Sequence, residues 1–162
     1  MAKIALQLEQ DGREWLSNRC LDPDVAQTMG IGQAGDHIAF NYESGKIQRI
    51  KYRNMQDKKD QSFGGKAPEE WVIPLFNQKD FKDKSYIIIT EGELDTVAVF
   101  QLGYTNVVSL PNGATSAEKT IKNHFKYLCE FETVYIFLIL MSPDNKQLRR
   151  LKKYCPNSNG VT

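Results

Sequence analysis

The sequence has few of the residues that build structural metal sites and disulfide frameworks. Its 162 residues include three cysteines, Cys20, Cys129 and Cys155, and two histidines, His37 and His124. The cysteines form no CxxC pair and no Cys/His cluster, which argues against a zinc site and favours reduced thiols in an intracellular protein. Neither histidine has an acidic or cysteine partner in register, so we expect structural or surface roles for both.

Long apolar runs, a nucleotide-motor motif and a charge imbalance are also missing. The longest apolar run, VYIFLILM, has the length of a strand, and no run reaches the roughly 18 residues of a membrane span. The N-terminus lacks the apolar region of a signal peptide, and the motif G-x-x-x-x-G-K-[ST] of a P-loop motor does not occur. The net charge is +1, so any nucleic-acid signal must be local. No membrane partner is expected.

The composition is that of a globular protein: hydrophobic residues make up 41% of the chain and charged residues 25%. The first 84 residues predict a small α+β unit. Residues 6–19 have the pattern of a helix, and a second helix follows Asp22, which can cap it, and ends near Gly30. HIAFNY and IQRIKYRN, joined by ESGK, predict a β-hairpin. The polar stretch MQDKKDQSFGGKAPEE predicts a loop.

Residues 85–162 show a different order of elements. YIIIT, NVVSL and TVYIFLILM predict three strands buried on both faces. ELDTVAVFQL predicts a helix that ends at Gly103. A second helix opens at Thr115, three residues before Glu118, and runs to about residue 128. A basic helix over residues 145–154 would complete a β-α-β-α-β-α order, which favours a parallel sheet with right-handed crossovers.

An acidic turn follows the first buried strand. Glu91 comes directly after YIIIT, Gly92 would allow a sharp bend, and Glu93 and Asp95 fall on the first turn of the helix. Ligands of parallel sheets bind beyond the carboxyl ends of the strands, and three carboxylates suit Mg²⁺ or Mn²⁺. The alternative is that acidic residues merely favour a helix N-terminus through its dipole.

The stretch IIITEGELDTVAVFQLGYTNVVSLPNGATS resembles the TOPRIM domain of primases, type IA topoisomerases and some nucleases. The upstream blocks WLSNRCLDPDVAQTMGIG, HIAFNYESGKIQRIKYRNMQDKK and PLFN resemble the subdomain before TOPRIM in the primase half of phage helicase-primases and of the related mitochondrial helicase. The likeness covers roughly residues 12–140 and implies an α/β fold with a Rossmann-like parallel sheet. It further implies that Glu91 is the catalytic or metal-organising carboxylate, that Asp95 supports it and that Glu93 has a secondary role.

The third buried strand departs from the family pattern. TOPRIM domains carry a second acidic motif, DxD, at its end, and here the two positions hold Ile139 and Met141. Neither can ligate Mg²⁺, which needs oxygen donors. Three explanations stay open: catalysis is impaired or lost, Asp144 substitutes as a metal ligand, or the sequence is altered in this stretch. The loss of the motif also weakens the alternative of a TOPRIM nuclease.

A basic cluster lies in the expected hairpin and loop. Residues 46–66 hold seven cations and two carboxylates, a balance of +5. Period-2 alternation places Arg49, Lys51 and Arg53 on one face of a strand, where they could follow a phosphate backbone. The alternative is a solvated edge strand protected by charge. The resemblance implies that Lys51 and Lys59 bind nucleotide and template, with Lys58 as the alternative to Lys59.

Two further features can be interpreted either as purely structural or as functional. Asn112 and Gly113 could offer backbone N–H groups to a phosphate, or form a plain turn. The last predicted helix places four cations on one face, which is either solvated or a secondary phosphate contact. These four are Lys146, Arg149, Arg150 and Lys153.

The resemblance implies a DNA primase-type nucleotidyltransferase fragment of DNA replication that binds single-stranded DNA and nucleoside triphosphates with Mg²⁺ or Mn²⁺. A replicative helicase domain is the expected protein partner. The alternative is a non-catalytic module that binds nucleic acid or a helicase. We expect domains at 1–84 and 85–162, with the second one cut short, and a cytoplasmic protein of bacterial or phage origin; a mitochondrial matrix protein is the less favoured alternative.

Overall fold

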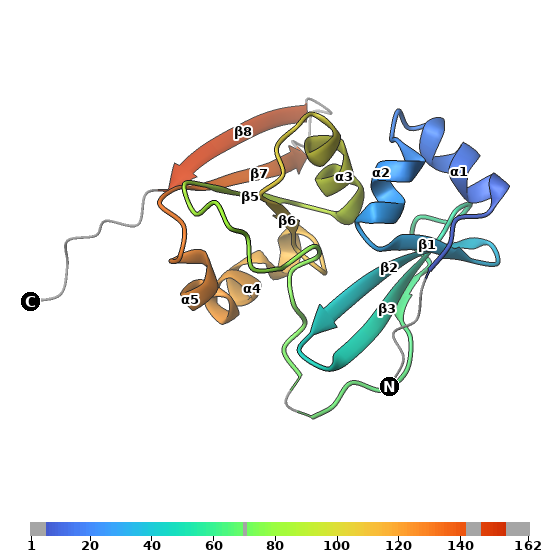
Figure 1. The fold of residues 1–162 in the computed structure, drawn as a ribbon, viewed down its shortest axis with the longest axis horizontal. Coiled ribbons are helices and arrows are strands. Elements are labelled where there is room, and N and C mark those ends of the chain that lie inside the picture. The colour runs from blue at the N-terminus through green and yellow to red at the C-terminus, as the bar shows by residue number, and fades with distance from the viewer. Residues whose placement is uncertain (1–5, 70, 142–146, 155–162) are drawn as a thin grey trace, which may run out of the picture.

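The computed structural model describes residues 6–69, 71–141 and 147–154. Two four-stranded sheets lie side by side, each with helices packed against it (Figure 1). The first part of the chain contains α1 (Gln10–Ser17), α2 (Pro23–Thr28), β1 (Ile31–Ala34), β2 (His37–Ser44), β3 (Ile47–Asn54) and β4 (Gln61–Phe63). The second part contains β5 (Ile87–Thr90), α3 (Glu93–Gln101), β6 (Val107–Ser109), the 3₁₀ turn η1 (Ala114–Ser116), α4 (Ala117–Asn123), α5 (Phe125–Leu128), β7 (Val134–Met141) and β8 (Gln147–Tyr154).

The first sheet is antiparallel in the order β1-β2-β3-β4. The predicted hairpin is confirmed: its register runs from His37 opposite Asn54 to Ser44 opposite Ile47. Two short strands were missed, since β1 lies at the end of the stretch interpreted as the second helix and β4 in the predicted loop. Because β1 and β4 occupy the edges, β3 is an inner strand and the solvated-edge interpretation of its cations is wrong.

Local signals set the boundaries of several helices correctly. The Asp22 carboxylate accepts hydrogen bonds from the backbone N–H groups of Asp24 and Val25, at 2.8 and 3.3 Å, and so caps α2. Gly30 follows that helix with φ +81°, and Gly103 follows α3 with φ +95°, both in the left-handed region that favours glycine. α1 is shorter than predicted because its regular turns begin only at Gln10.

The second sheet has the order β6-β5-β7-β8. β5 pairs in parallel with β6 and β7, as predicted, with Ile89 opposite Val108 and Ile136. The helices cover both faces: α4 and α5 pack on the face that carries Ile89 and Ile136, while α3 meets the other face through Thr96, whose Oγ1 lies 2.8 Å from Thr90 Oγ1. The mixed α/β class with a parallel three-strand core is therefore confirmed.

The predicted basic helix over residues 145–154 is wrong. Gln147–Tyr154 forms β8, which pairs antiparallel with β7 from Met141 opposite Gln147 to Val134 opposite Tyr154. The edge of β7 presents a row of backbone donors and acceptors, and pairing with it overrides the helical spacing of the cations. Arg149, Arg150 and Lys153 consequently do not share a helix face. Residues 145 and 146 lie outside the described part of the chain.

The helix predicted from Thr115 is also interrupted. η1 comes first, α4 begins at Ala117 after Ser116, and neither helix has a side-chain cap, so the predicted capping box does not form. α4 and α5 are separated at His124, which has φ −105° and ψ 11°. Its ring is buried, and its Nε2 lies 3.0 Å from the carbonyl oxygen of Ile73, so His124 has the structural role expected of it.

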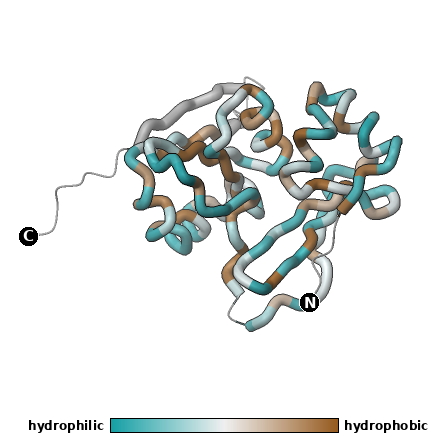
Figure 2. Tube along the Cα trace, viewed as in Figure 1, coloured by the Kyte–Doolittle hydropathy of each residue, from teal (hydrophilic) through white to brown (hydrophobic). Residues whose placement is uncertain are grey.

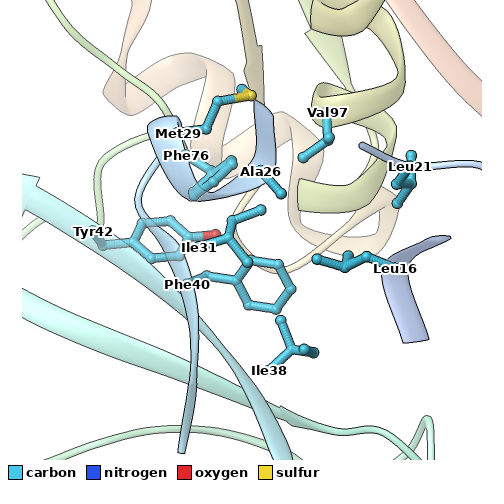
Figure 3. Close-up of a cluster of buried hydrophobic side chains, with 10 residues drawn as sticks. All are labelled: Leu16, Leu21, Ala26, Met29, Ile31, Ile38, Phe40, Tyr42, Phe76 and Val97. Atoms are coloured by element: carbon cyan, nitrogen blue, oxygen red, sulfur yellow. The ribbon is translucent and has the colours of Figure 1, made fainter. Parts of the chain in front are cut away.

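Two hydrophobic clusters stabilise the fold. The first joins β2 to α1, α2 and α3 through side chains such as Leu16, Ile38, Phe40 and Val97 (Figure 3). The second fills the space between the parallel sheet and helices α4 and α5. The hydropathy trace shows hydrophobic stretches where the elements meet and hydrophilic residues on the outer helices and loops (Figure 2). Because the first cluster includes Val97 of α3, it holds the two parts of the chain together.

Candidate functional site

The acidic turn lies at the carboxyl end of β5, as the sequence predicts. Glu91 follows Thr90, Gly92 precedes α3, and Glu93 and Asp95 lie on the first helical turn. Gly92 is extended, with φ −139° and ψ 168°, so this turn does not need the conformational freedom of glycine that the sequence suggested. The Thr90 and Thr96 hydroxyl groups meet behind the turn, and Thr96 N–H donates to Gly92 O at 3.2 Å. These contacts fix the acidic turn on the end of the strand.

A cavity of about 660 Å³ opens between the acidic turn and the first sheet. One wall is the acidic turn itself. The opposite wall comes from β3, β4 and the loop between them, and a third wall comes from the loop after β6. The lining residues are Lys51, Arg53, Lys58, Gln61, Ser62, Phe63, Glu91, Gly92, Glu93, Leu94, Asp95, Leu110, Asn112 and Gly113.

A buried hydrogen-bonded ion pair crosses from the first sheet to the acidic turn. Lys51 Nζ lies 2.7 Å from Glu93 Oε1 and donates a second hydrogen bond, also 2.7 Å, to the carbonyl oxygen of Pro111. Tyr42 donates its hydroxyl proton to the same Glu93 oxygen at 2.5 Å. Burial raises the pKa of Tyr42 well above its usual value, and the Glu93 carboxylate raises it further, so the phenol remains a donor at neutral pH.

The other predicted cations have different surroundings. Arg53 lines the cavity beside Lys51, and Lys58 lines it from the exposed loop. Lys59, which the structure also describes, is exposed outside that lining. Arg49 is held by the carbonyl oxygens of residues 64 and 65, at 3.0 and 2.6 Å, and its guanidinium lies over Trp71 at 4.9 Å. The cation row therefore faces into the molecule along a sheet face that it shares with Tyr42.

Asp95 lies close to two other carboxylates, those of Glu91 and Glu93. Burial raises the pKa of the Asp95 carboxyl above its usual value. The hydrogen bond from the Gly92 backbone and the positive charge of Arg53 act in the opposite direction, while the charges of Glu91 and Glu93 raise the pKa further. A ligand that brings positive charge to Asp95 would relieve this repulsion.

The donor set fits a single hydrated cation better than a metal pair. Within residues 6–69, 71–141 and 147–154, no group of three or more His, Cys, Asp or Glu side chains could hold a metal ion. Glu91 and Asp95 nevertheless both line the cavity, and Mg²⁺ is commonly bound through one or two carboxylates together with water and phosphate oxygens. A bound Mg²⁺ would supply neutralisation of phosphate charge. Asp144, the doubtful fourth ligand, lies outside the described residues.

Sequence reasoning missed Tyr42 and the partners of His37. The ESGK turn fixes the hairpin register, and this register already places Tyr42 opposite Arg49 on the cationic face; the contact with Glu93 has no local signal. His37 Nδ1 lies 2.6 Å from an Asp36 oxygen and its Nε2 lies 3.1 Å from Asp60, so the expectation that it lacks acidic partners is wrong. Asn112 and Gly113, both candidates, do line the cavity.

Comparison of the sequence with known proteins gives matches to primase-type proteins, although no family model matches. The chain is 34% identical over 99 residues to a primase homolog protein of Arabidopsis thaliana, covering 56% of this chain and 28% of that protein. It is 31% identical over 109 residues to the Twinkle homolog protein, chloroplastic/mitochondrial, of the same organism, covering 62% and 13%. It is 27% identical over 119 residues to the DNA helicase/primase of Enterobacteria phage T3, covering 72% and 20%. The chain thus spans less than a third of the length of each of these relatives.

Solved structures show the same fold. The primase fragment of the bacteriophage T7 primase-helicase has a TM-score of 0.66 at 22% identity, covering 88% of this chain and 62% of that one. A second match is a structure of the T7 lagging-strand DNA polymerase with the primase domains of two gp4 subunits bound to an RNA/DNA hybrid and dTTP. Its TM-score is 0.64 at 25% identity, covering 80% of this chain and 67% of that one. The zinc-binding and RNA polymerase domains of the Aquifex aeolicus primase have a TM-score of 0.60 at 17% identity, covering 81% of this chain and 43% of that one.

The chain therefore resembles the primase part of helicase-primases in sequence and fold. Among the described residues, no helix is both long and apolar enough to cross a membrane.

Proposed function

We propose that this chain is a primase-type domain of DNA replication that binds nucleoside triphosphates and single-stranded DNA in the cavity between its two sheets. We further propose that RNA primer synthesis is impaired or lost. An active relative would join ribonucleotides by attack of a 3′-hydroxyl on an α-phosphate. In this chain Glu91 and Asp95 would hold Mg²⁺ or Mn²⁺, and the cations across the cavity would bind phosphate.

The observation that carries the proposal is the placement of opposite charges on facing walls. Glu91 and Asp95 line one wall, and Arg53 and Lys58 line the other. A nucleoside triphosphate carries negative phosphates that need cations, and its metal ion needs carboxylate oxygens. The cavity of about 660 Å³ lies within the range of roughly 300–1,000 Å³ for small-molecule sites.

The impairment is proposed from the end of β7. This strand continues for four residues beyond Phe137, the residue paired with Thr90, and the sequence supplies no oxygen-bearing side chain over that extension. Chemistry with two metal ions needs ligands on both sides of the reacting phosphate. With Glu91 and Asp95 alone on one side, binding would persist while the transfer step is lost.

The relatives support the partners we propose. One of them is a DNA helicase/primase, and one of the matched structures holds primase domains on an RNA/DNA hybrid with dTTP. A replicative helicase domain is accordingly the proposed protein partner, and the cytoplasm of a bacterial or phage-infected cell is the proposed location.

Nucleotide binding can be measured with fluorescently labelled ATP in Mg²⁺ and in EDTA. Lys58→Glu reverses a charge on the cavity wall and should weaken binding by tenfold or more, on the scale of about 1.4 kcal/mol for a charge-assisted contact. Lys126→Glu is the matched control, because Lys126 is exposed on α5, outside the cavity. Equal effects of the two reversals would disprove a nucleotide site in this cavity.

Catalysis is tested separately by template-dependent synthesis of oligoribonucleotides. We expect the wild-type chain to give little or no product, and Glu91→Gln to abolish whatever activity remains. Robust synthesis by the wild type would disprove the impairment. Equal synthesis by both proteins would remove Glu91 from the mechanism.

A non-catalytic nucleic-acid module is the second candidate, favoured by the same lack of oxygen donors along the end of β7. It predicts single-strand binding that is independent of Mg²⁺ and weakens with salt. Lys58→Glu should lower the slope of log K against log salt by about 0.7, the value for one phosphate contact to a single strand. A requirement for Mg²⁺ in oligonucleotide binding would argue against this candidate.

A further inference from the structure

Lys51 connects three separate pieces of the cavity wall. It lies on β3, opposite Phe40 of β2 in the hairpin register. Its ammonium group donates to Glu93 at the start of α3 and to the carbonyl oxygen of Pro111, each at 2.7 Å. Pro111 immediately precedes Asn112 and Gly113, which line the cavity. One side chain therefore joins the first sheet to the acidic turn and to the loop after β6.

The surroundings of Lys51 differ from those of a cation that awaits a ligand. Its side chain is 9% exposed and that of Glu93 is 6% exposed. An ammonium group has three N–H donors, and two of the three are engaged within the protein. Lys58, by contrast, is exposed and lines the same cavity. On this wall Lys51 is therefore bonded within the protein, whereas Lys58 can reach a ligand.

Glu93 has a matching set of contacts. The Lys51 ammonium group and the Tyr42 hydroxyl both donate to its Oε1, and these two donors belong to neighbouring strands of the first sheet. Removing one partner of a buried ion pair is strongly destabilising, whereas removing both charges together is often tolerated. This asymmetry separates a lysine that acts through Glu93 from a lysine that binds phosphate.

We propose that Lys51 is a positioning residue: through Glu93 and Pro111 it sets the distance between the cationic wall, the acidic turn and the loop after β6. Phosphate is bound by the more accessible cations of the wall, Lys58 and Arg53. The phosphate-binding part rests on the proposed function; the positioning part does not require any ligand. This reverses the role that the family resemblance implies for Lys51.

The test is a double-mutant cycle between Lys51→Met and Glu93→Gln. Thermal stability and the Kd for labelled ATP are measured for the wild type, both single variants and the double variant. We expect Lys51→Met to raise the Kd by between about twofold and 100-fold, the range of coupling between residues in contact. In the double variant no buried charge is left without a partner, so the two neutral side chains can pack at the wild-type separation of the walls. Both the melting temperature and the Kd should therefore return most of the way to wild type.

Lys58→Met, with and without Glu93→Gln, is the matched comparison. Lys58→Met should weaken binding while leaving the melting temperature unchanged, and Glu93→Gln should not rescue it. If Lys51 binds phosphate itself, the double variant will regain stability but keep the weak ATP binding of Lys51→Met. That result would overturn the proposal, as would a wild-type Kd in Lys51→Met.

Glu93→Gln alone decides the matter if Lys51→Met does not fold. It keeps the lysine and removes the negative charge beside it. A positioning lysine is then left buried without its counter-charge, which disturbs the packing of the acidic turn against the first sheet and weakens ATP binding. A phosphate-binding lysine is instead released, and ATP binding strengthens or stays the same. The second result would overturn the proposal.

The ligand-free protein separates this inference from the proposed function. The backbone amide resonances of Gly92 and Gly113 report on the acidic turn and on the loop after β6. We expect both resonances to shift in Lys51→Met but not in Lys58→Met, and the melting temperatures of the cycle to be non-additive. If the wild type binds no ATP, the proposed function fails while these measurements still support or overturn the positioning role. Additive melting temperatures with unshifted resonances would overturn it.

Discussion

Replacing Tyr42 by Phe removes a single hydrogen bond from the centre of the molecule. Tyr42 is 1% exposed, and its hydroxyl donates to the Glu93 carboxylate. A hydrogen bond to a charged group contributes about 1.5–3 kcal/mol. We take the lower end, about 1.5 kcal/mol, because Lys51 still donates to the same oxygen. For a chain of this size about 1 kcal/mol corresponds to 2–4 °C, so the melting temperature should fall by about 3–6 °C.

The matched control is Tyr52→Phe. Tyr52 is half-buried on the opposite face of the hairpin, beside the His37 ring, and its hydroxyl makes no hydrogen bond within the described residues. Its loss should change stability by no more than about 0.5 kcal/mol. Thermal unfolding followed by circular dichroism compares the two variants. Equal melting temperatures for Tyr42→Phe and Tyr52→Phe would show that the Tyr42–Glu93 contact does not stabilise the fold.

The pH dependence of the Tyr42→Phe effect gives a second check. The pKa of Tyr42 is raised in the folded protein by burial and by Glu93. The hydrogen bond should therefore contribute in full below the unfolded pKa of about 10 and be lost only as pH rises through the folded value. The difference in stability between wild type and Tyr42→Phe should accordingly be constant from about pH 6 to pH 9.

Three further predictions concern stability in urea or heat. Asp95→Asn should stabilise the protein at pH 7 by about 0.5–1 kcal/mol. The raised pKa of Asp95 means that ionisation of its carboxyl weakens the fold. The gain from the substitution should vanish as the pH falls towards about 4, where the carboxyl is protonated. The Asp60 and Asp36 carboxylates outweigh desolvation and raise the pKa of His37, so His37→Asn should cost up to about 1 kcal/mol at pH 5.5 and less at pH 9. Asp22→Ala should cost about 1 kcal/mol through loss of the cap on α2. An unchanged unfolding midpoint in any of the three variants would contradict the physical cause given for that residue.

The acidic turn could be predicted because its signals are local. An apolar run long enough for one buried strand ends at Thr90, and the next residues are acidic and begin a helix that ends before Gly103. Position at the end of a parallel strand then gives the location of the site. The same local logic placed the end of α2 at Gly30 and the hairpin turn between Ser44 and Ile47.

Of three wrong predictions, two concern residues whose structure depends on partners elsewhere in the chain. Gln147–Tyr154 carries cations at helical spacing, yet its pairing with β7 determines its structure. Thr115 and Glu118 have the spacing of a capping box, but the chain first makes a 3₁₀ turn after Gly113, whose φ is +67°. His37 gains Asp60 only because β4 folds back beside β3. The pairing with β7 and the ion pair with Asp60 are not visible in the residues next to the position concerned, whereas the 3₁₀ turn follows Gly113, two residues before Thr115.

The cationic face of β3 shows how far a periodic pattern can be used. Alternation correctly groups Arg49, Lys51 and Arg53, and the hairpin register adds Phe40 and Tyr42 to the same face. It does not say what packs against that face. Here the face is a hydrophobic core around Phe40 and a cavity wall around Arg53.

Lys51 lies at the boundary between these two regions, where neither water nor a hydrocarbon neighbour alone would suit it. Its ion pair with Glu93 solves this problem for both side chains, because each buried charge has the other as its partner. The arrangement also explains why the acidic motif contains two glutamates with different surroundings. Glu91 lines the cavity, whereas Glu93 is buried and bonded to the first sheet. A buried pair of this kind is weak evidence for stability but fixes one relative placement of the elements that carry it. The geometry of the cavity thus depends on contacts that a ligand need never touch.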